Sequence, residues 1–239
     1  MPLERLDKIL SGQNIASRKE TKELVRRGLV SADGRTVQRA DEKFDPEKTI
    51  ITVEGKTVAY KKYLYIMLNK PRGILSASRD RHTPTVVDLL PQELKREGLF
   101  PAGRLDKDTE GFILITDDGE LAHRMLAPKS HVFKLYEAVC DRPLTQTDVT
   151  LFAQGIVCGD EKYLPAKMKI TGEKTALVEI CEGKFHQVRK MFHAVGTEVL
   201  RLKRLRIGEV YLDPTLGSGK CRELNSDEII KIISQKNEL

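Results

Sequence analysis

One segment of nine residues, 103–111, constrains this chain more than any other, because charged residues crowd between two glycines directly before an apolar run. It reads Gly-Arg-Leu-Asp-Lys-Asp-Thr-Glu-Gly, and the apolar residues 112–115 follow it. This order predicts a polar loop that enters a buried strand, with a turn at 117–119 closing the strand. A carboxylate held at the end of a rigid strand is a common arrangement in catalytic sites. Taken alone, the segment also fits a solvated charged turn.

The composition is that of a globular protein and argues against a membrane-spanning or a secreted protein. The chain has 239 residues, enough for one or two domains, and 40% of them are hydrophobic. No apolar run approaches the roughly 20 residues that a transmembrane helix needs. Residues 1–5 are too charged for the start of a secretion signal. We therefore expect a cytoplasmic protein without a membrane partner.

The cysteines and the net charge bound the chemistry further. The four cysteines are scattered without a Cys-x-x-Cys pair, which argues against a structural zinc site and favours reduced thiols. The formal net charge of +6 permits a polyanionic partner without requiring one. The cysteines are Cys140, Cys158, Cys181 and Cys221.

Residues 1–60 are predicted to form a small separate module. An apolar stripe at helical spacing predicts a short helix over 3–11. Ser17 and Glu20 form a capping box that begins a second helix, and Gly28 suits its left-handed end. Asp-Gly at 33–34 and Glu-Gly at 54–55 predict two hairpins. A linker is expected at 61–62.

The second helix of this module is basic. Its five bases and two acids give a local charge of +3, which by itself is also typical of a solvated face. The succession Arg-Leu-Asp-Lys-Ile-Leu, Ser-Arg-Lys-Glu, Arg-Arg-Gly-Leu-Val and Asp-Gly-Arg, however, resembles the S4 RNA-binding domain. The resemblance implies that this helix neutralises RNA phosphates and reads little sequence. The implied RNA-binding residues are Arg5, Lys8, Ser17, Arg18, Lys19, Lys22, Arg26 and Arg27.

Residues 63–239 are predicted to form one compact region of the α+β class, with a largely antiparallel mixed sheet flanked by helices. Apolar and alternating runs predict strands at 63–69, 74–77, 132–139, 175–181 and 199–207. Helical spacing and caps predict helices at 120–126 and 145–154, around 188–192, and from Asn225 onward.

Four motifs of this region resemble, in order, those of the pseudouridine synthases. They are Lys-Pro-x-Gly at 70–73, Gly-Arg-Leu-Asp at 103–106, Lys-x-Tyr at 134–136 and a basic motif at 183–192. The resemblance implies that Asp106 is the essential residue and that Tyr136 stacks on the target base and assists proton transfer. It also implies that Arg189, or alternatively Lys190, pairs with Asp106 and holds it ionised. Arg104, Lys184 and Lys190 are expected to contact RNA.

Other interpretations of these residues stay open at this point. A strand tyrosine such as Tyr136 is often core packing, and Arg189 also fits an exposed helix charge. His186 is expected to be structural. Three acids at 106–110 without a nearby histidine predict no metal site, and the synthase family needs no metal. Four bases within 201–206 are expected to line an RNA groove; they are Arg201, Lys203, Arg204 and Arg206.

The resemblance implies a specific reaction, the isomerisation of a uridine in RNA to pseudouridine. The N1–C1′ bond breaks, the uracil turns over and C5 joins C1′, so nothing is added and no cofactor is expected. The target base is expected to flip out of its stack. Asp106 either attacks C1′ or removes the 2′ proton to give a glycal, and the sequence leaves both open.

The nearest branch is the ribosomal small-subunit pseudouridine synthase A type, which implies small-subunit rRNA, free or in an assembly particle, as the partner of a monomer. Lys107 stands where large-subunit relatives commonly have Tyr, and the long basic tail of many of them is not seen. The alternatives are a large-subunit rRNA synthase, a non-catalytic RNA-binding assembly factor, and a nucleic-acid N-glycosylase.

Overall fold

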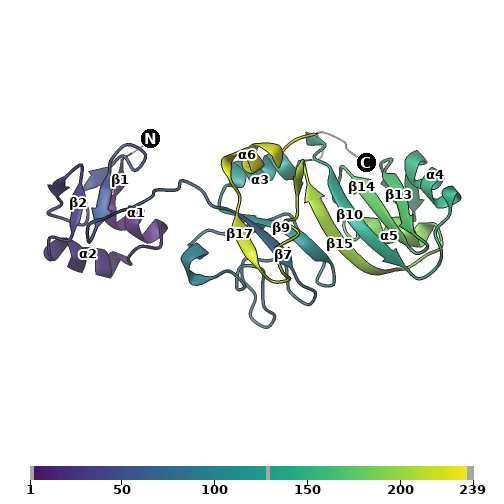
Figure 1. Cartoon of the computed structure of the whole chain (residues 1–239), viewed down its shortest axis with the longest axis horizontal. Helices are drawn as coiled ribbons and strands as arrows, with labels where there is room; N and C mark the ends of the chain where they lie inside the picture. Colours follow the sequence, from purple (N-terminus) through teal and green to yellow (C-terminus); the bar gives the residue numbers. More distant parts are fainter. Residues whose placement is uncertain (1–2, 128–129, 236–239) are drawn as a thin grey trace. The chain divides into compact units, whose positions relative to one another are not determined.

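The computed structural model describes residues 3–127 and 130–235, and its chain divides into two compact units (Figure 1). The first unit contains Met1–Leu64 together with Pro91–Gly98, and the second contains Tyr65–Leu90 and Leu99–Leu239. Residues at the ends of these ranges, 1–2 and 236–239, lie outside the described part of the chain, as do 128–129. Within the described part, no helix is long and apolar enough to cross a membrane.

The first unit packs two short helices against a small sheet. Helices α1 (Leu6–Gly12) and α2 (Arg18–Arg26) bury Leu6, Ile9 and Leu10 in a common apolar core. The predicted capping box is confirmed, because the Ser17 hydroxyl accepts from the backbone of Glu20 and the Glu20 carboxylate accepts from the backbone of Ser17. The strands follow the order β3-β2-β5-β6, and β1 pairs with β4. Their bounds are β1 Glu4–Arg5, β2 Val30–Ala32, β3 Arg35–Thr36, β4 Lys43–Phe44, β5 Ile51–Val53 and β6 Lys56–Thr57.

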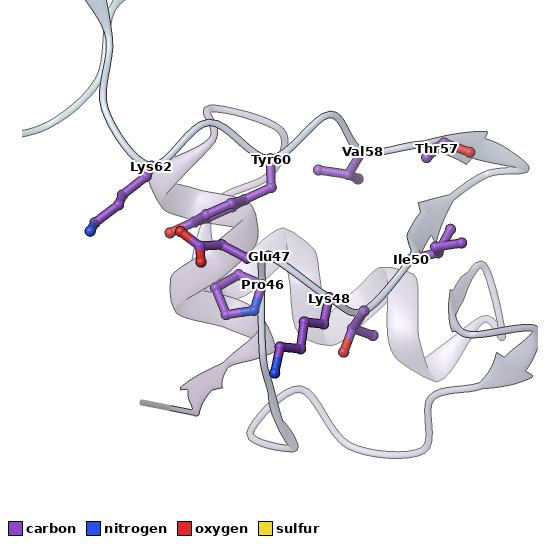
Figure 2. A pocket seen from close by; sticks show the side chains of 9 residues that line it. Pro46, Glu47, Lys48, Ile50, Thr57, Val58, Tyr60 and Lys62 are labelled. Carbon is purple, nitrogen blue, oxygen red and sulfur yellow. The ribbon is translucent and has the colours of Figure 1, made fainter. Parts of the chain in front are cut away.

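Both predicted hairpins of this unit are confirmed, since β2 pairs with β3 and β5 pairs with β6. The predicted first helix begins later than expected, because residues 4–5 pair with β4 as a short strand. The 3-10 helix η1 (Gln92–Leu94) belongs to this unit as well. A depression beside the Tyr60 ring is shown in Figure 2, where Glu47 lies among basic and apolar neighbours. Its lining residues are Pro46, Glu47, Lys48, Thr49, Ile50, Thr57, Val58, Tyr60 and Lys62.

The second unit is built on a mixed sheet whose main strand order is β13-β14-β10-β15-β9-β7-β17 (Figure 1). Strand β8 pairs with β9, and β16 pairs with β15. Neighbouring strands run antiparallel except for β9 and β15, which are parallel. The predicted α+β class with a largely antiparallel sheet is confirmed. The bounds are β7 Tyr65–Lys70, β8 Phe100–Ala102, β9 Glu110–Thr116, β10 Lys134–Cys140, β13 Lys167–Gly172, β14 Thr175–Ile180, β15 Val199–Ile207, β16 Val210–Tyr211 and β17 Cys221–Glu223.

Helices cover the two ends of this sheet. Near β7 and β9, helices α3 (Gly119–Leu126) and α6 (Ser226–Lys231) lie together over one apolar cluster that includes Met67, Phe112 and Leu114 (Figure 1). Toward the other end, α4 (Gln146–Gln154) and α5 (Gln187–Ala194) are joined by the rings of Phe152 and Phe192, whose centroids are 4.9 Å apart. The small hairpin of β11 (Ile156–Cys158) and β12 (Glu161–Tyr163) lies between α4 and β13 in the chain.

The predicted strand at 74–77 is wrong. The segment forms an isolated bridge between Leu75 and Thr85 and no strand. Leu75 donates to the carbonyl of Pro84 and accepts from Val86, so its backbone is satisfied by the loop that follows it. The sequence interpretation also omitted β11, β12, β13 and β17, whose polar or alternating residues carry a weak strand signal.

Candidate active site

The segment 103–109 is a loop that is fastened from within by Lys70, the last residue of β7. The Lys70 ammonium is fully buried and donates to the carbonyl oxygens of Asp106, Lys107 and Thr109 at 3.1, 3.2 and 2.9 Å. It also donates to the carbonyl of Pro71. Burial lowers the Lys70 pKa to about 8, opposed by the carboxylates of Asp108 and Asp106. Sequence reasoning treated Lys70 only as part of a turn and missed this role.

Two further contacts fix the backbone on either side of Asp106. The Ser76 hydroxyl accepts from the Leu105 N–H at 3.0 Å and donates to the Leu105 carbonyl at 2.7 Å. The Gly73 N–H donates to the Lys107 carbonyl at 2.7 Å. Because both neighbours of Asp106 are held, its side chain leaves a rigid stretch of backbone, which suits a catalytic carboxylate.

The Asp106 side chain retains 27% of its exposure, and one of its oxygens lies 3.4 Å from Nε2 of His186. His186 precedes α5 and has a φ of +54°, a left-handed conformation that costs free energy for a residue other than glycine. Its ring stacks on the Phe185 ring at a centroid distance of 3.8 Å. Phe185 itself is 66% exposed. The expectation that His186 is merely structural does not account for its place beside Asp106.

The predicted ion pair between Arg189 and Asp106 is not the one that forms. The Arg189 guanidinium donates to the Val199 carbonyl at 2.7 Å and pairs with Asp108 at 2.7 Å. Its anchor on β15 therefore directs Arg189 to the second carboxylate of the loop. The alternative base, Lys190, pairs with Glu161 of β12.

Tyr136 belongs to a row of residues that crosses the sheet beside this loop. The register places Lys70 of β7 opposite Gly111 of β9, Gly111 opposite Arg204 of β15, and Arg204 opposite Tyr136 of β10. Arg204 donates from Nε to the Phe112 carbonyl at 2.7 Å and from Nη1 to the Tyr136 hydroxyl at 3.4 Å. Tyr136 is 8% exposed.

Gly111 is required where the loop enters this row. Its φ is +100°, and a Cβ there would lie 2.2 Å from the carbonyl oxygen of Arg204. Only glycine allows β9 to approach β15 this closely. The second glycine of the motif therefore serves the packing of β9, which follows the Asp106 loop, against β15, which pairs with the strand of Tyr136.

The expectation that four bases within 201–206 line an RNA groove is wrong for two of them. Arg204 and Arg206 are buried, because β15 lies in the interior of the sheet between β9 and β10. Arg201 pairs with Glu110 at 2.6 Å. Arg204 and Arg206 are thus internal and cannot contact phosphates at a surface, whereas Arg201 is exposed and Lys203 is half-buried.

The other predicted RNA-binding residues lie in different surroundings. On the second unit, Arg104 is exposed, and Lys184 donates to the Lys162 carbonyl. On the first unit, Arg5 pairs with Asp7 and Lys8 with Glu4, both next to α1. The bases of α2 and of its C-cap residue are all exposed; they are Arg18, Lys19, Lys22 and Arg26 in the helix and Arg27 at its cap.

Comparison with known proteins identifies the family. Residues 64–194 match the family model described as RNA pseudouridylate synthase, so the chain belongs to that family and is an RNA pseudouridine synthase, an isomerase. The chain is 46% identical over 230 residues to an uncharacterized RNA pseudouridine synthase of Bacillus subtilis, covering 94% of this chain and 96% of the relative. It is 36% identical over 232 residues to ribosomal small subunit pseudouridine synthase A of Escherichia coli, covering 96% and 100%. A crystal structure of a pseudouridylate synthase, 33% identical, matches with a TM-score of 0.67 over 96% of this chain and 99% of that one.

Proposed function

We propose that this protein converts a uridine of small-subunit ribosomal RNA to pseudouridine, with Asp106 as the essential carboxylate. The observation that carries the proposal is the way the Asp106 loop is held. The buried Lys70 ammonium donates to three carbonyls of this loop and to the carbonyl of Pro71, while the Asp106 carboxylate stays partly exposed. The substrate follows from relatives named ribosomal small subunit pseudouridine synthase A, which match over nearly their whole length at 36–40% identity.

In this proposal one residue of the site acts on the ribose of the target nucleotide and another acts on its base. Asp106 acts at the sugar, either as nucleophile at C1′ or as base at the 2′ position. Tyr136 stacks on the flipped uracil and assists its proton transfer. Arg189 supports the loop through Asp108, and His186 lies within reach of the Asp106 carboxylate. The reaction is an isomerisation, so it needs no cofactor.

We further propose that residues 1–60 act as an S4-like RNA-binding domain and that 63–239 form the catalytic domain. The exposed bases of α2 support this assignment, because exposed Lys and Arg bind phosphates through release of counterions. Arg104, Lys184 and Lys190 would add phosphate contacts on the catalytic side. An rRNA substrate implies a cytoplasmic enzyme, and we expect it to act as a monomer.

The test is direct. Purified protein is incubated with unmodified small- and large-subunit rRNA, each free and as assembly particles, and pseudouridine is mapped by carbodiimide treatment and primer extension. The proposal expects one new stop on small-subunit RNA. A stop only on large-subunit RNA would contradict the substrate and leave the chemistry intact. Release of free uracil would indicate an N-glycosylase, and no stop on any RNA would favour a non-catalytic assembly factor.

A further inference from the structure

Two arginines of β15, two positions apart, are both buried, but only one of them has a carboxylate that balances its charge. Arg206 is fully buried and forms an ion pair with Glu179 of β14, which is buried as well. Arg204 is 4% exposed. Among the described residues its side chain hydrogen-bonds only to the Phe112 carbonyl and the Tyr136 hydroxyl, and its Nη2 has no partner.

A β-bulge explains why the two arginines have different neighbours. The register between β10 and β15 shifts between Leu135 and Tyr136, so that Leu135 lies opposite Arg206 and Tyr136 lies opposite Arg204. Directly opposed residues share a face of the sheet, whereas successive residues of β10 point to opposite faces. Arg206 therefore meets Glu179 on the face of Leu135, and Arg204 is turned to the face of Tyr136.

A second buried cation lies on the Tyr136 face. Lys134 is two residues before Tyr136 on β10, and it is only 6% exposed. No described residue gives its ammonium group a hydrogen bond or an ion pair. Burial, and after it the positive charge of Arg204, lower the Lys134 pKa to about 8, and Cys181 opposes the shift. Two cations thus lie near each other on the Tyr136 face, and neither forms an ion pair with a carboxylate of the described residues.

Such an arrangement is unfavourable in the resting protein. A buried charge without a counter-charge is costly, and a like charge nearby adds to the cost. Hydrophobic residues of the same size would fold at least as well in these positions. The uncompensated positive charge is explained if the site must hold negative charge during its reaction, because preorganised charge is most effective where water is excluded.

We propose that Lys134 and Arg204 form a buried cationic pair that stabilises the negative charge on the uracil when its bond to C1′ breaks. This inference rests on the proposed function. When the N1–C1′ bond breaks, its electron pair stays on the uracil, which is then an anion, while Asp106 bonds to C1′ or removes the 2′ proton. The anion is neutralised when C5 donates an electron pair to C1′, after which the C5 proton leaves and N1 takes up a proton. Arg204 acts on that anion through the Tyr136 hydroxyl, and Lys134 acts on it through space, so neither touches the reacting atoms directly.

A phosphate of the RNA backbone is a poorer occupant for this pair. Phosphates stay at the surface of a complex, and both cations are more than nine-tenths buried. The flipped base, in contrast, reaches into a pocket and stacks on side chains there. The cations lie around Tyr136, the residue proposed to stack on that base.

The test replaces Lys134 by Met, which removes the charge and keeps the length of the side chain. Turnover is measured by tritium release from unmodified small-subunit rRNA that carries tritium at C5. We expect Lys134→Met to lower kcat by about 100-fold with KM nearly unchanged, and Lys134→Arg to recover most of kcat. The melting temperature of Lys134→Met should equal or exceed that of the wild type. The exposed Lys169 of β13 provides the control, Lys169→Met, which should leave both quantities unchanged.

A second measurement separates charge stabilisation from a structural effect. The same rRNA is transcribed with 5-fluorouridine, whose base leaves as a more stable anion, and consumption of the nucleoside is followed by chromatography after nuclease digestion. The loss of rate in Lys134→Met should be smaller with 5-fluorouridine than with uridine. An equal loss with both substrates, wild-type kcat in Lys134→Met, or a lowered melting temperature would each overturn the inference. An inactive wild type would instead overturn the proposed function.

Discussion

Cations of the same two residue types occur in two contrasting settings, the surface of α2 in the first unit and the interior of the catalytic sheet. On α2 the bases are exposed, and the one ion pair there, between Arg26 and Glu23, is itself largely exposed, so it adds little stability. In the sheet, Lys70, Lys134 and Arg204 are buried. Lys70 and Arg204 donate to carbonyls and Arg204 also to the Tyr136 hydroxyl, whereas Lys134 has no hydrogen-bond or ion-pair partner among the described residues. The first setting provides charge that salt can screen, and the second provides charge at fixed positions. In the function proposed here, α2 contributes RNA affinity and the buried cations of the sheet contribute to catalysis.

The largest expected effect separates affinity from turnover. Asp106→Asn keeps the shape of the side chain and removes its nucleophilicity and basicity, so we expect tritium release to fall by more than about 1,000-fold. RNA affinity, measured by filter binding, should change little because phosphate contacts lie elsewhere. Turnover near the wild-type rate would remove Asp106 from its proposed role.

The next effect concerns the buried charge that does have a partner. Glu179→Gln leaves the Arg206 guanidinium buried without its carboxylate, and we expect the free energy of unfolding to fall by about 3 kcal/mol or more. Urea unfolding followed by circular dichroism measures it, with the exposed Glu173→Gln as control. Lys134→Met, in contrast, should not lower the free energy of unfolding. The difference between the two variants would show that a buried cation with a carboxylate partner stabilises the fold differently from one without. Equal stability of the two variants would break that distinction.

A smaller effect is expected from the exposed bases. Changing Arg26 and Arg27 together to Glu should weaken RNA binding and reduce the slope of log affinity against log salt by about 2, because fewer counterions are released. The reaction rate at saturating RNA should stay the same. Two exposed bases outside α2, Arg39 and Lys56, provide the matched control pair. An unchanged salt slope would show that α2 is not the RNA surface.

The smallest expected effect is a pH dependence of stability. The folded pKa of Lys134 is about 8, below its unfolded value of roughly 10.4. Between these two values the unfolded chain binds more protons, so the stability of the wild type rises with pH there. The free-energy cost of burying the protonated Lys134 ammonium is fully present below about pH 8. The stability advantage of Lys134→Met over the wild type, measured by urea unfolding, should therefore shrink between pH 7.5 and about 10. A constant difference would mean that Lys134 is not a buried charge.

The sequence by itself determined the local features of this protein. The capping box at Ser17 and Glu20, the two hairpins and the strand after Gly111 all follow from patterns within a few residues, and the structure confirms them. The order of the motifs also sufficed to identify the family, which the match over 64–194 confirms.

Only the tertiary structure decided which charges meet. Lys70 fastens a loop 36 to 39 residues away, and Arg204 bonds to Phe112, 92 residues before it. Arg189 pairs with Asp108 because its guanidinium is anchored on β15, and a bulge in β15 at Leu205 sends Arg204 and Arg206 to different partners. Sequence patterns report the period of one element, whereas these contacts depend on strand order and on a one-residue shift in register, which no local pattern encodes.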